Sequence, residues 1–188
     1  MVILKKSENM FTIQVEQDLI DYCKNQVTQF NFGKRHVANG TPEQQLTGII
    51  GQSVVMELFD LEKINGKHGF DGGIDLVFNN KRIDVKTMGR TTNVKSHYTN
   101  NFLKLQDYFD TDIYIFCSYH KTKKKVTVCG WISKDDFVLK RRFYKKGSTR
   151  TRSDGTSFKT FSDLYEIDNN NLNQVNSIDE LKDQLLQL

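Results

Sequence analysis

The chain carries, at positions 73–86, the stretch Gly73-Ile74-Asp75-Leu76-Val77-Phe78-Asn79-Asn80-Lys81-Arg82-Ile83-Asp84-Val85-Lys86. On both sides of the Asn pair, apolar residues alternate with other residues, which is the pattern of two half-buried strands. Asn tolerates positive φ better than most residues, so Asn79-Asn80 predicts a two-residue hairpin turn. In that register Asp75 lies directly across from Asp84.

Two facing acids need a physical reason. Directly opposed residues of a hairpin have Cβ atoms about 4.5–5.5 Å apart, and like charges there are destabilising. A divalent cation supplies a reason, because Mg²⁺ takes oxygen ligands and is commonly held by one or two carboxylates. Lys86 follows Asp84 by two positions and projects from the same face of its strand. The alternative is an exposed hairpin face that carries two acids and a lysine but no site.

A helix is predicted over residues 41–59, directly before the hairpin. Thr41 is a favourable N-cap, Pro42 suits the first helical position, and Gln44 completes a Thr-x-x-Gln capping box. The apolar residues of its core face recur at helical spacing, at Leu46, Ile49, Ile50, Val54 and Leu58.

A second stripe of the same helix contains Gln45, Gly48 and Gln52. A glycine inside a helix costs about 1 kcal/mol relative to Ala. A close approach by backbone, a metal site or nucleic acid would explain the glycine at position 48. Close packing of the helix on the sheet, with two solvated glutamines, is the alternative.

Together these features resemble the catalytic core of the PD-(D/E)xK nuclease superfamily. Asp75 matches the first acid of the family signature, and Asp84-Val85-Lys86 matches its (Asp/Glu)-x-Lys element. Gly48-x-x-Gly51-Gln52 is similar to the family's Gly-x-x-Gly-Glu stretch, with Gln where Glu is usual. The proline that nominally precedes the first acid is absent, since Asp75 follows Gly73-Ile74. The resemblance covers roughly residues 41–137, with order and spacing intact.

The resemblance implies an α/β fold with a restriction-endonuclease-like mixed β-sheet flanked by helices. It also implies a nuclease that uses Mg²⁺, with Mn²⁺ as an alternative ion. The metal ligands would be Asp75, Asp84 and the backbone carbonyl of Val85. Lys86 would position the attacking water and stabilise the developing charge. Gln52 would orient the water or Lys86 from the helix, and the nearby Glu43 is a weaker candidate for the missing carboxylate.

The rest of the sequence fits one nuclease-like domain over residues 1–188, with a basic loop and a terminal helix appended to the core. No apolar run approaches 18 residues, so we expect no membrane span. The three cysteines lack CxxC spacing and indicate reduced packing residues and a cytoplasmic location. Periodicity and capping residues predict helices over 14–29 and 102–109, a loop over 87–100, strands over 112–119 and 125–132, a short helix after Ser133, an edge strand over 164–167 and a last helix from Ser177.

The basic residues are concentrated between positions 121 and 152, although the formal net charge of the chain is only +4. Within that stretch only Asp135 and Asp136 oppose them. A basic segment interleaved with aromatic and small residues suits phosphate contacts, and residues 147–155 are predicted to form a flexible loop that orders on substrate. A solvated charge run is the alternative. The residues expected to bind nucleic acid are Arg90, Arg141, Arg142, Lys145, Lys146, Arg150 and Arg152.

We therefore expect an endonuclease that hydrolyses phosphodiester bonds in double-stranded DNA. A nuclease-like fold that binds DNA without hydrolysing it is the competing class, and Gln52 is the feature that favours it. A protein that needs no Mg²⁺ and binds acidic partners through its basic loop is a third alternative. Restriction, repair, recombination and phage DNA processing all stay open, and so does the oligomeric state, with a homodimer as one alternative.

Overall fold

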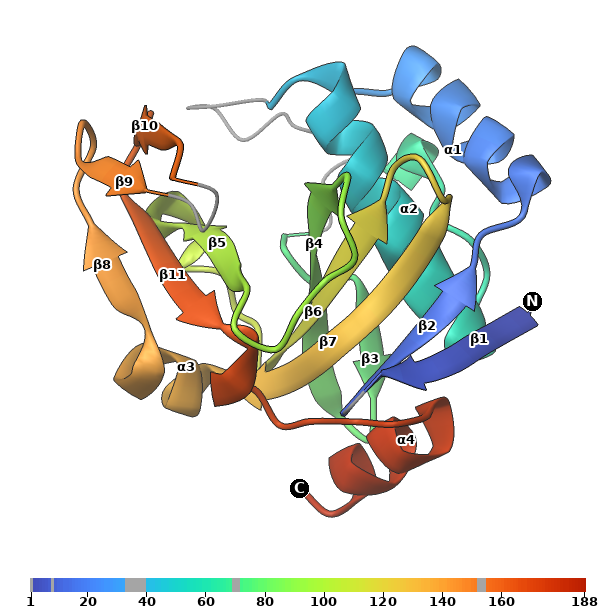
Figure 1. The fold of residues 1–188 in the computed structure, drawn as a ribbon. Helices are drawn as coiled ribbons and strands as arrows, with labels where there is room; N and C mark the ends of the chain where they lie inside the picture. Colours follow the sequence, from blue (N-terminus) through green and yellow to red (C-terminus); the bar gives the residue numbers. More distant parts are fainter. Residues whose placement is uncertain (1, 8, 33–39, 69–71, 152–154) are drawn as a thin grey trace.

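The computed structural model describes residues 2–7, 9–32, 40–68, 72–151 and 155–188. Its largest element is a six-stranded sheet in the order β1-β2-β7-β6-β4-β3 (Figure 1). β4 and β6 run parallel, and every other neighbouring pair is antiparallel. The mixed α/β class expected from the sequence is confirmed. The strands are β1 (Val2–Ser7), β2 (Met10–Gln14), β3 (Leu76–Phe78), β4 (Lys81–Arg90), β6 (Ile113–His120) and β7 (Lys125–Ser133).

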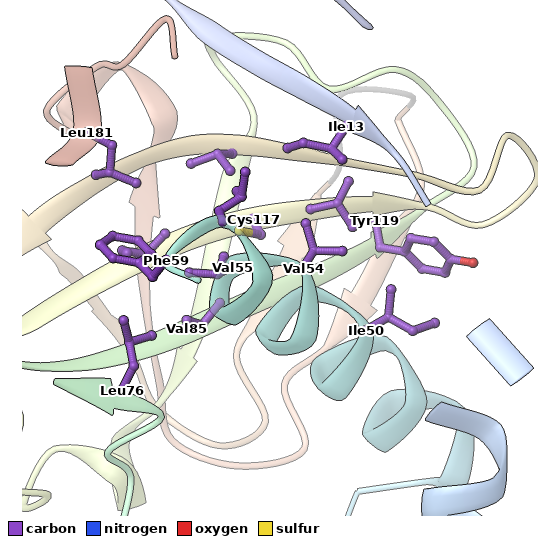
Figure 2. Close-up of a cluster of buried hydrophobic side chains, with 14 of the residues drawn as sticks. Ile13, Ile50, Val54, Val55, Phe59, Leu76, Val85, Cys117, Tyr119 and Leu181 are labelled. Carbon is purple, nitrogen blue, oxygen red and sulfur yellow. The ribbon is translucent and has the colours of Figure 1, made fainter. Parts of the chain in front are cut away.

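Three helices contribute to the core on one face of this sheet: α1 (Gln17–Gln29), α2 (Pro42–Leu58) and α4 (Ile178–Leu186). Figure 2 shows α2 lying over the sheet, with its apolar side chains directed at the strands. Within the described ranges, no helix is long and apolar enough to cross a bilayer. The buried cluster on this face includes Ile13, Ile50, Val54, Val55, Val85, Cys117 and Leu181.

A side lobe covers part of the opposite face (Figure 1). It contains a three-stranded sheet in the order β5-β11-β8, the hairpin β9–β10 and helix α3. An aromatic cluster joins the lobe to β6 and includes Phe102, Tyr114, Phe116, Phe137 and Tyr165. The elements of the lobe are β5 (Thr99–Leu103), α3 (Lys134–Lys140), β8 (Arg142–Tyr144), β9 (Thr149–Thr151), β10 (Ser157–Lys159) and β11 (Leu164–Asp168). Single 3-10 turns occur at Gly66–His68, Lys104–Gln106 and Asn169–Asn171.

Local capping and turn signals are confirmed. Thr41 Oγ1 accepts a hydrogen bond from the Gln44 N–H at 3.2 Å, and Gln44 Oε1 accepts one from the Thr41 N–H at 2.8 Å. Asn79 and Asn80 have φ values of 48° and 59°, the positive values that a two-residue I′ turn requires. The hydroxyl of Ser133 caps α3, as expected. These features depend on residues within a few positions of one another.

Several elements that depend on distant pairing were predicted wrongly. The helix expected over 102–109 is instead the end of β5 followed by a 3-10 turn. The loop expected over 87–100 contains the last residues of β4, and the expected flexible loop over 147–155 contains β9. β11 is the central strand of its sheet rather than an edge, because it pairs with both β5 and β8.

The close approach between α2 and the sheet occurs at Gly51. A Cβ at that position would lie 1.9 Å from Thr87 Oγ1 and 2.8 Å from Thr87 Cβ. A Cβ at Gly48 would meet nothing within 4 Å among the described residues. The glycine that lets α2 sit on β4 is therefore Gly51, and no packing contact explains Gly48.

We predict opposite effects for the two helix glycines. Gly51→Ala should lower the free energy of unfolding by about 2 kcal/mol or more, because the Thr87 side chain cannot move away without shifting β4. Gly48→Ala should raise it by up to about 1 kcal/mol, because Ala has the higher helix propensity and the space is open. Urea denaturation of both variants measures these changes, and equal losses at the two positions would contradict the packing.

Asp112 ties the start of β4 to the start of β6. Its Oδ2 accepts hydrogen bonds from the backbone N–H and the Nε of Arg82, at 2.8 and 2.9 Å, and its Oδ1 lies 2.7 Å from the second guanidinium nitrogen. Asp112 N–H donates in turn to the Arg82 carbonyl at 2.9 Å. Hydrogen bonds from the Arg82 side chain lower the pKa of Asp112 to about 2.

We predict a pH-dependent loss of stability on Asp112→Asn. The folded-state pKa is depressed below the unfolded value of about 3.9. The stabilisation is therefore fully present above about pH 4 and disappears as the pH falls through about 2. Urea midpoints of the wild type and the variant, measured from pH 7 to pH 2, should differ at neutral pH and converge at the acid end. A constant gap across that range would contradict the ion pair as the cause.

Candidate active site

Asp75 lies at the point where β3 begins. The expected hairpin register is confirmed for Leu76 opposite Ile83 and for the two pairs nearer the turn. The Asp75 N–H donates to the Ile83 carbonyl at 2.9 Å, and Asp75 Oδ2 accepts the N–H of Val85 at 2.6 Å. The expected pairing of Asp75 with Asp84 is not part of the ladder, which ends at Leu76 and Ile83. The partners of Asp75 are instead the two residues that flank Asp84 in β4.

The segment that leads into Asp75 is held in place. Gly73 has a φ of +83°, and a Cβ there would lie 2.3 Å from the ring of Phe109. The Gly73 carbonyl also accepts a hydrogen bond from Thr111 Oγ1 at 2.9 Å. Both the backbone conformation and the close ring therefore require glycine at this position. This contact fixes where the chain enters β3, and with it the position of Asp75.

The Val85 carbonyl points to the same edge of β4 as the Asp75 carboxylate. In a strand, the N–H and the C=O of one residue are directed to the same neighbouring strand. The Val85 N–H is directed to Asp75. The ladder with β3 ends two residues earlier in β4, at the pair Leu76–Ile83. At the start of β3, the main chain of β4 thus presents the Val85 carbonyl on the side where Asp75 lies.

Asp84 and Lys86 project from the face of β4 opposite to Val85, by the alternation of a strand. Lys86 Nζ lies 2.5 Å from Asp84 Oδ2. Asp84 is only 2% exposed, and the Lys86 ammonium lies 5.4 Å from the centre of the Phe102 ring. The pair is therefore largely removed from water, and the ammonium compensates the charge of a buried carboxylate.

Tyr114 is a neighbour of this pair that the sequence did not indicate. It lies opposite Asp84 in the parallel ladder of β4 and β6, so both side chains project from the same face. Tyr114 is fully buried, and its hydroxyl has no hydrogen-bond partner among the residues that the structure describes. Burial, followed by the negative charge of Asp84, raises the pKa of this phenol. Only the pairing of β4 with β6 shows that Tyr114 is a neighbour of Asp84, because the two residues are far apart in sequence.

The structure does not bring Gln52 into contact with Lys86. Gln52 is a buried residue of α2, and α2 packs on the face of β4 that carries Val85 and Thr87. The sheet therefore separates the helix from the Asp84 and Lys86 side chains. No hydrogen bond within the described ranges joins Gln52 to either of them. Glu43, the weaker candidate, forms an ion pair with Lys121 at 2.6 Å instead.

Most of the arginines expected to contact nucleic acid bind acids of the protein itself. Arg141 pairs with Asp107 and stacks over the ring of Tyr165, 3.7 Å from its centre. Arg142 lies 2.7 Å from Asp168, and Arg150 lies 2.6 Å from Glu166. The acids come from β11 and from the segment after β5, so the local sequence around the arginines does not show them. Phosphate would have to compete with these carboxylates.

The remaining residues expected to contact nucleic acid differ in how exposed they are. Arg90 is partly buried over the ring of Tyr98, and burial lowers the pKa of its guanidinium. Arg152 lies outside the described residues. Lys145 and Lys146 are exposed and take part in none of the ion pairs within the described part of the chain. Arg142 is also exposed but is paired with Asp168, so these two lysines are the described members of the predicted set that are both exposed and outside any of these ion pairs.

The oxygen donors where β3 begins fit Mg²⁺ in their chemistry. Within the described ranges, no group of three or more His, Cys, Asp or Glu side chains could hold a metal ion. The expected set is smaller, with the two carboxylates of Asp75 and Asp84 and the Val85 carbonyl. Mg²⁺ keeps several waters and is usually bound by one or two carboxylates plus substrate phosphates, whereas Zn²⁺ favours nitrogen and sulfur ligands.

No protein-family model matches this chain. The comparisons with curated proteins and with solved structures return no match either. The chemistry proposed below therefore rests on the residues of this chain and their geometry.

We predict that Lys86→Ala is destabilising and that Mg²⁺ reverses part of the loss. Removing the ammonium beside the buried Asp84 carboxylate should lower the free energy of unfolding by roughly 3 kcal/mol. Mg²⁺ should then stabilise the variant more than the wild type, because no ammonium competes for Asp84. Urea denaturation with Mg²⁺ or EDTA measures both effects, and Lys24→Ala on the exposed side of α1 is the control. An equal gain from Mg²⁺ in the wild type and Lys86→Ala would contradict this competition.

Proposed function

We propose that this chain is a Mg²⁺-dependent endonuclease acting on DNA, with a restriction-endonuclease-like core. The observation that carries the proposal is the arrangement where β3 begins beside β4. There the Asp75 carboxylate binds the Val85 N–H, and Asp84 and Lys86 form a buried pair one residue to either side. An acid at the start of one strand and an acid–x–lysine on the next are the parts that the resemblance to the PD-(D/E)xK nucleases implies for metal-assisted phosphodiester hydrolysis.

Asp75, Asp84 and the Val85 carbonyl are the residues that would hold Mg²⁺ or Mn²⁺. When bound, the ion would polarise the scissile phosphate and lower the pKa of a coordinated water. The hydrogen bond from the Val85 N–H fixes the orientation of the Asp75 carboxylate before any ligand arrives. A carboxylate held in this way loses little further freedom on binding, which favours a preorganised site.

Lys86 supplies the positive charge of the proposed site. Its ammonium is held between Asp84 and the Phe102 ring, and its side chain is 15% exposed. The four-carbon stem would allow the ammonium to shift from Asp84 toward a phosphate oxygen or a water that enters the site. There it would orient the water and stabilise the charge that develops during hydrolysis. The surrounding aromatic residues limit competing water.

DNA, in double-stranded form, is the proposed substrate. The accessible Lys145 and Lys146 of the side lobe are available for its phosphates. The three cysteines are buried free thiols, which supports a cytoplasmic setting. A DNA-binding module without hydrolysis is the second candidate, and the position of Gln52 away from Lys86 favours it. Activity assays separate the two.

We predict cleavage of plasmid and linear DNA with Mg²⁺ or Mn²⁺ and none with EDTA. Asp84→Asn and Lys86→Ala should each lower the rate at least about a hundredfold, since one removes a ligand and the other the stabilising charge. The Lys24→Ala control should cut at the wild-type rate. Gel assays below the melting temperature of each variant keep unfolding out of the comparison.

Two outcomes would contradict the proposed activity. Robust wild-type cleavage that Lys86→Ala leaves unchanged would remove Lys86 from the chemistry. A wild type that binds DNA but stays silent with both metals would establish the binding module instead.

A further inference from the structure

Phe161 is the most exposed large apolar side chain among the described residues, at 92%. It lies in the short connection between β10 and β11 of the side lobe. Single exposed apolar residues are common on protein surfaces and need no function. Phe161 differs because of the rigidity of its setting and the charges around it.

Hydrogen bonds on both sides fix the backbone that carries Phe161. The Thr160 N–H donates to the Ser148 carbonyl at 3.0 Å, and the Gly147 N–H donates to the Thr160 carbonyl at 2.8 Å. Thr160 Oγ1 donates to the Lys145 carbonyl at 2.7 Å, and Asp163 Oδ1 accepts the Lys146 N–H at 2.9 Å. The turn over residues 145–148 and the connection over 160–163 therefore form one rigid platform, defined by these two segments.

The platform is strongly basic. Lys145 and Lys146 belong to it, and Lys159 lies two residues before Phe161; all three are exposed. The carboxylate of Asp163 is the acid within the platform, and it is engaged by the Lys146 N–H and by Lys104 Nζ at 3.6 Å. The hydrogen bond from Lys146 also lowers the pKa of Asp163, so this carboxylate stays ionised and bound. The ring is thus presented to solvent among lysines.

We infer that Phe161 stacks on an unpaired base of a DNA strand whose phosphates Lys145 and Lys146 contact. An exposed ring beside lysines is complementary to single-stranded nucleic acid, where every base has an accessible π-face and every linkage a negative charge. A regular duplex covers its base faces by stacking and offers the ring no partner. An acidic protein surface would pair with the lysines but would not require a fixed aromatic ring.

This inference rests on the proposed function and narrows its substrate class. Part of the side lobe reaches the proposed site, since Phe102 of β5 lies against Lys86. The β9–β10 end of the lobe, next to the platform, lies away from β3 in Figure 1, so we expect the ring to contact DNA away from the reacting phosphate. The substrate would then be DNA that contains both a duplex to be cut and an unpaired segment, such as a splayed end or a gap. Phe161 contributes to choosing that substrate and not to the chemical step.

The test is DNA affinity without cleavage, measured by fluorescence anisotropy in EDTA with labelled single-stranded, splayed and fully duplex oligonucleotides. Phe161→Ala should weaken single-stranded and splayed DNA by roughly fivefold to a hundredfold and leave duplex affinity unchanged. Phe161→Trp should retain affinity, and its added fluorescence should be quenched by single-stranded DNA; the chain has one other tryptophan, the buried Trp131. Leu139→Ala, which truncates an 80% exposed side chain of α3, is the matched control.

The outcomes separate this inference from the proposed function. Unchanged single-strand affinity in Phe161→Ala, an equal loss in Leu139→Ala, or an equal loss for duplex DNA would each overturn the stacking contact. If the wild type nevertheless cuts DNA and Lys86→Ala does not, the proposed nuclease function stands although the stacking contact is refuted. A wild type that neither binds nor cuts any DNA overturns both. Circular dichroism of the variants confirms that the compared proteins are folded.

Discussion

The parallel pairing of β4 with β6 is the constraint on which the rest of the structure depends. It places alternate residues of β4 on two chemically different faces. One face carries Ile83 and Val85 into the core beneath α2, and the other carries Asp84 and Lys86 toward the side lobe. A shift of one residue would exchange the two sets, burying charges under the helix and exposing core residues. The proposed chemistry and the core are therefore fixed by the same register.

The sequence was sufficient where structure follows from neighbouring residues. The Asn79-Asn80 turn, the Thr41 capping box and the Ser133 cap each need only a few consecutive positions, and each is present as predicted. The hairpin register from Phe78–Lys81 to Leu76–Ile83 followed from the turn. The expected pairing of Asp75 across from Asp84 is not part of this ladder, which ends at Leu76 and Ile83, and Asp75 instead contacts the main chain of Ile83 and Val85. The two strands β6 and β7 were recognised from apolar runs because they are buried on both faces.

Other features depend on contacts that no local pattern encodes. β5 was predicted as part of a loop and a helix, because its pairing with β11 joins residues more than sixty positions apart. The Glu166 and Asp168 carboxylates that bind Arg150 and Arg142 belong to that same distant strand. The run of basic residues therefore predicted more unpaired positive charge than the structure has, because these acids neutralise two of the arginines. The burial of Tyr114 next to Asp84 and the separation of Gln52 from Lys86 also follow only from the tertiary arrangement.

The short length of β3 affects how readily β4 could pair with a strand of another copy of the chain. β3 has three residues and β4 has ten, so much of one edge of β4 extends past its partner. An extended strand with an open edge invites another chain to pair with it, which is a common route to aggregation. The Asp75 carboxylate accepts the Val85 N–H at the first position where a foreign carbonyl could bind, and it adds a negative charge there. The acid that the proposed hydrolysis would use thus also blocks the addition of a foreign strand at this edge of the sheet.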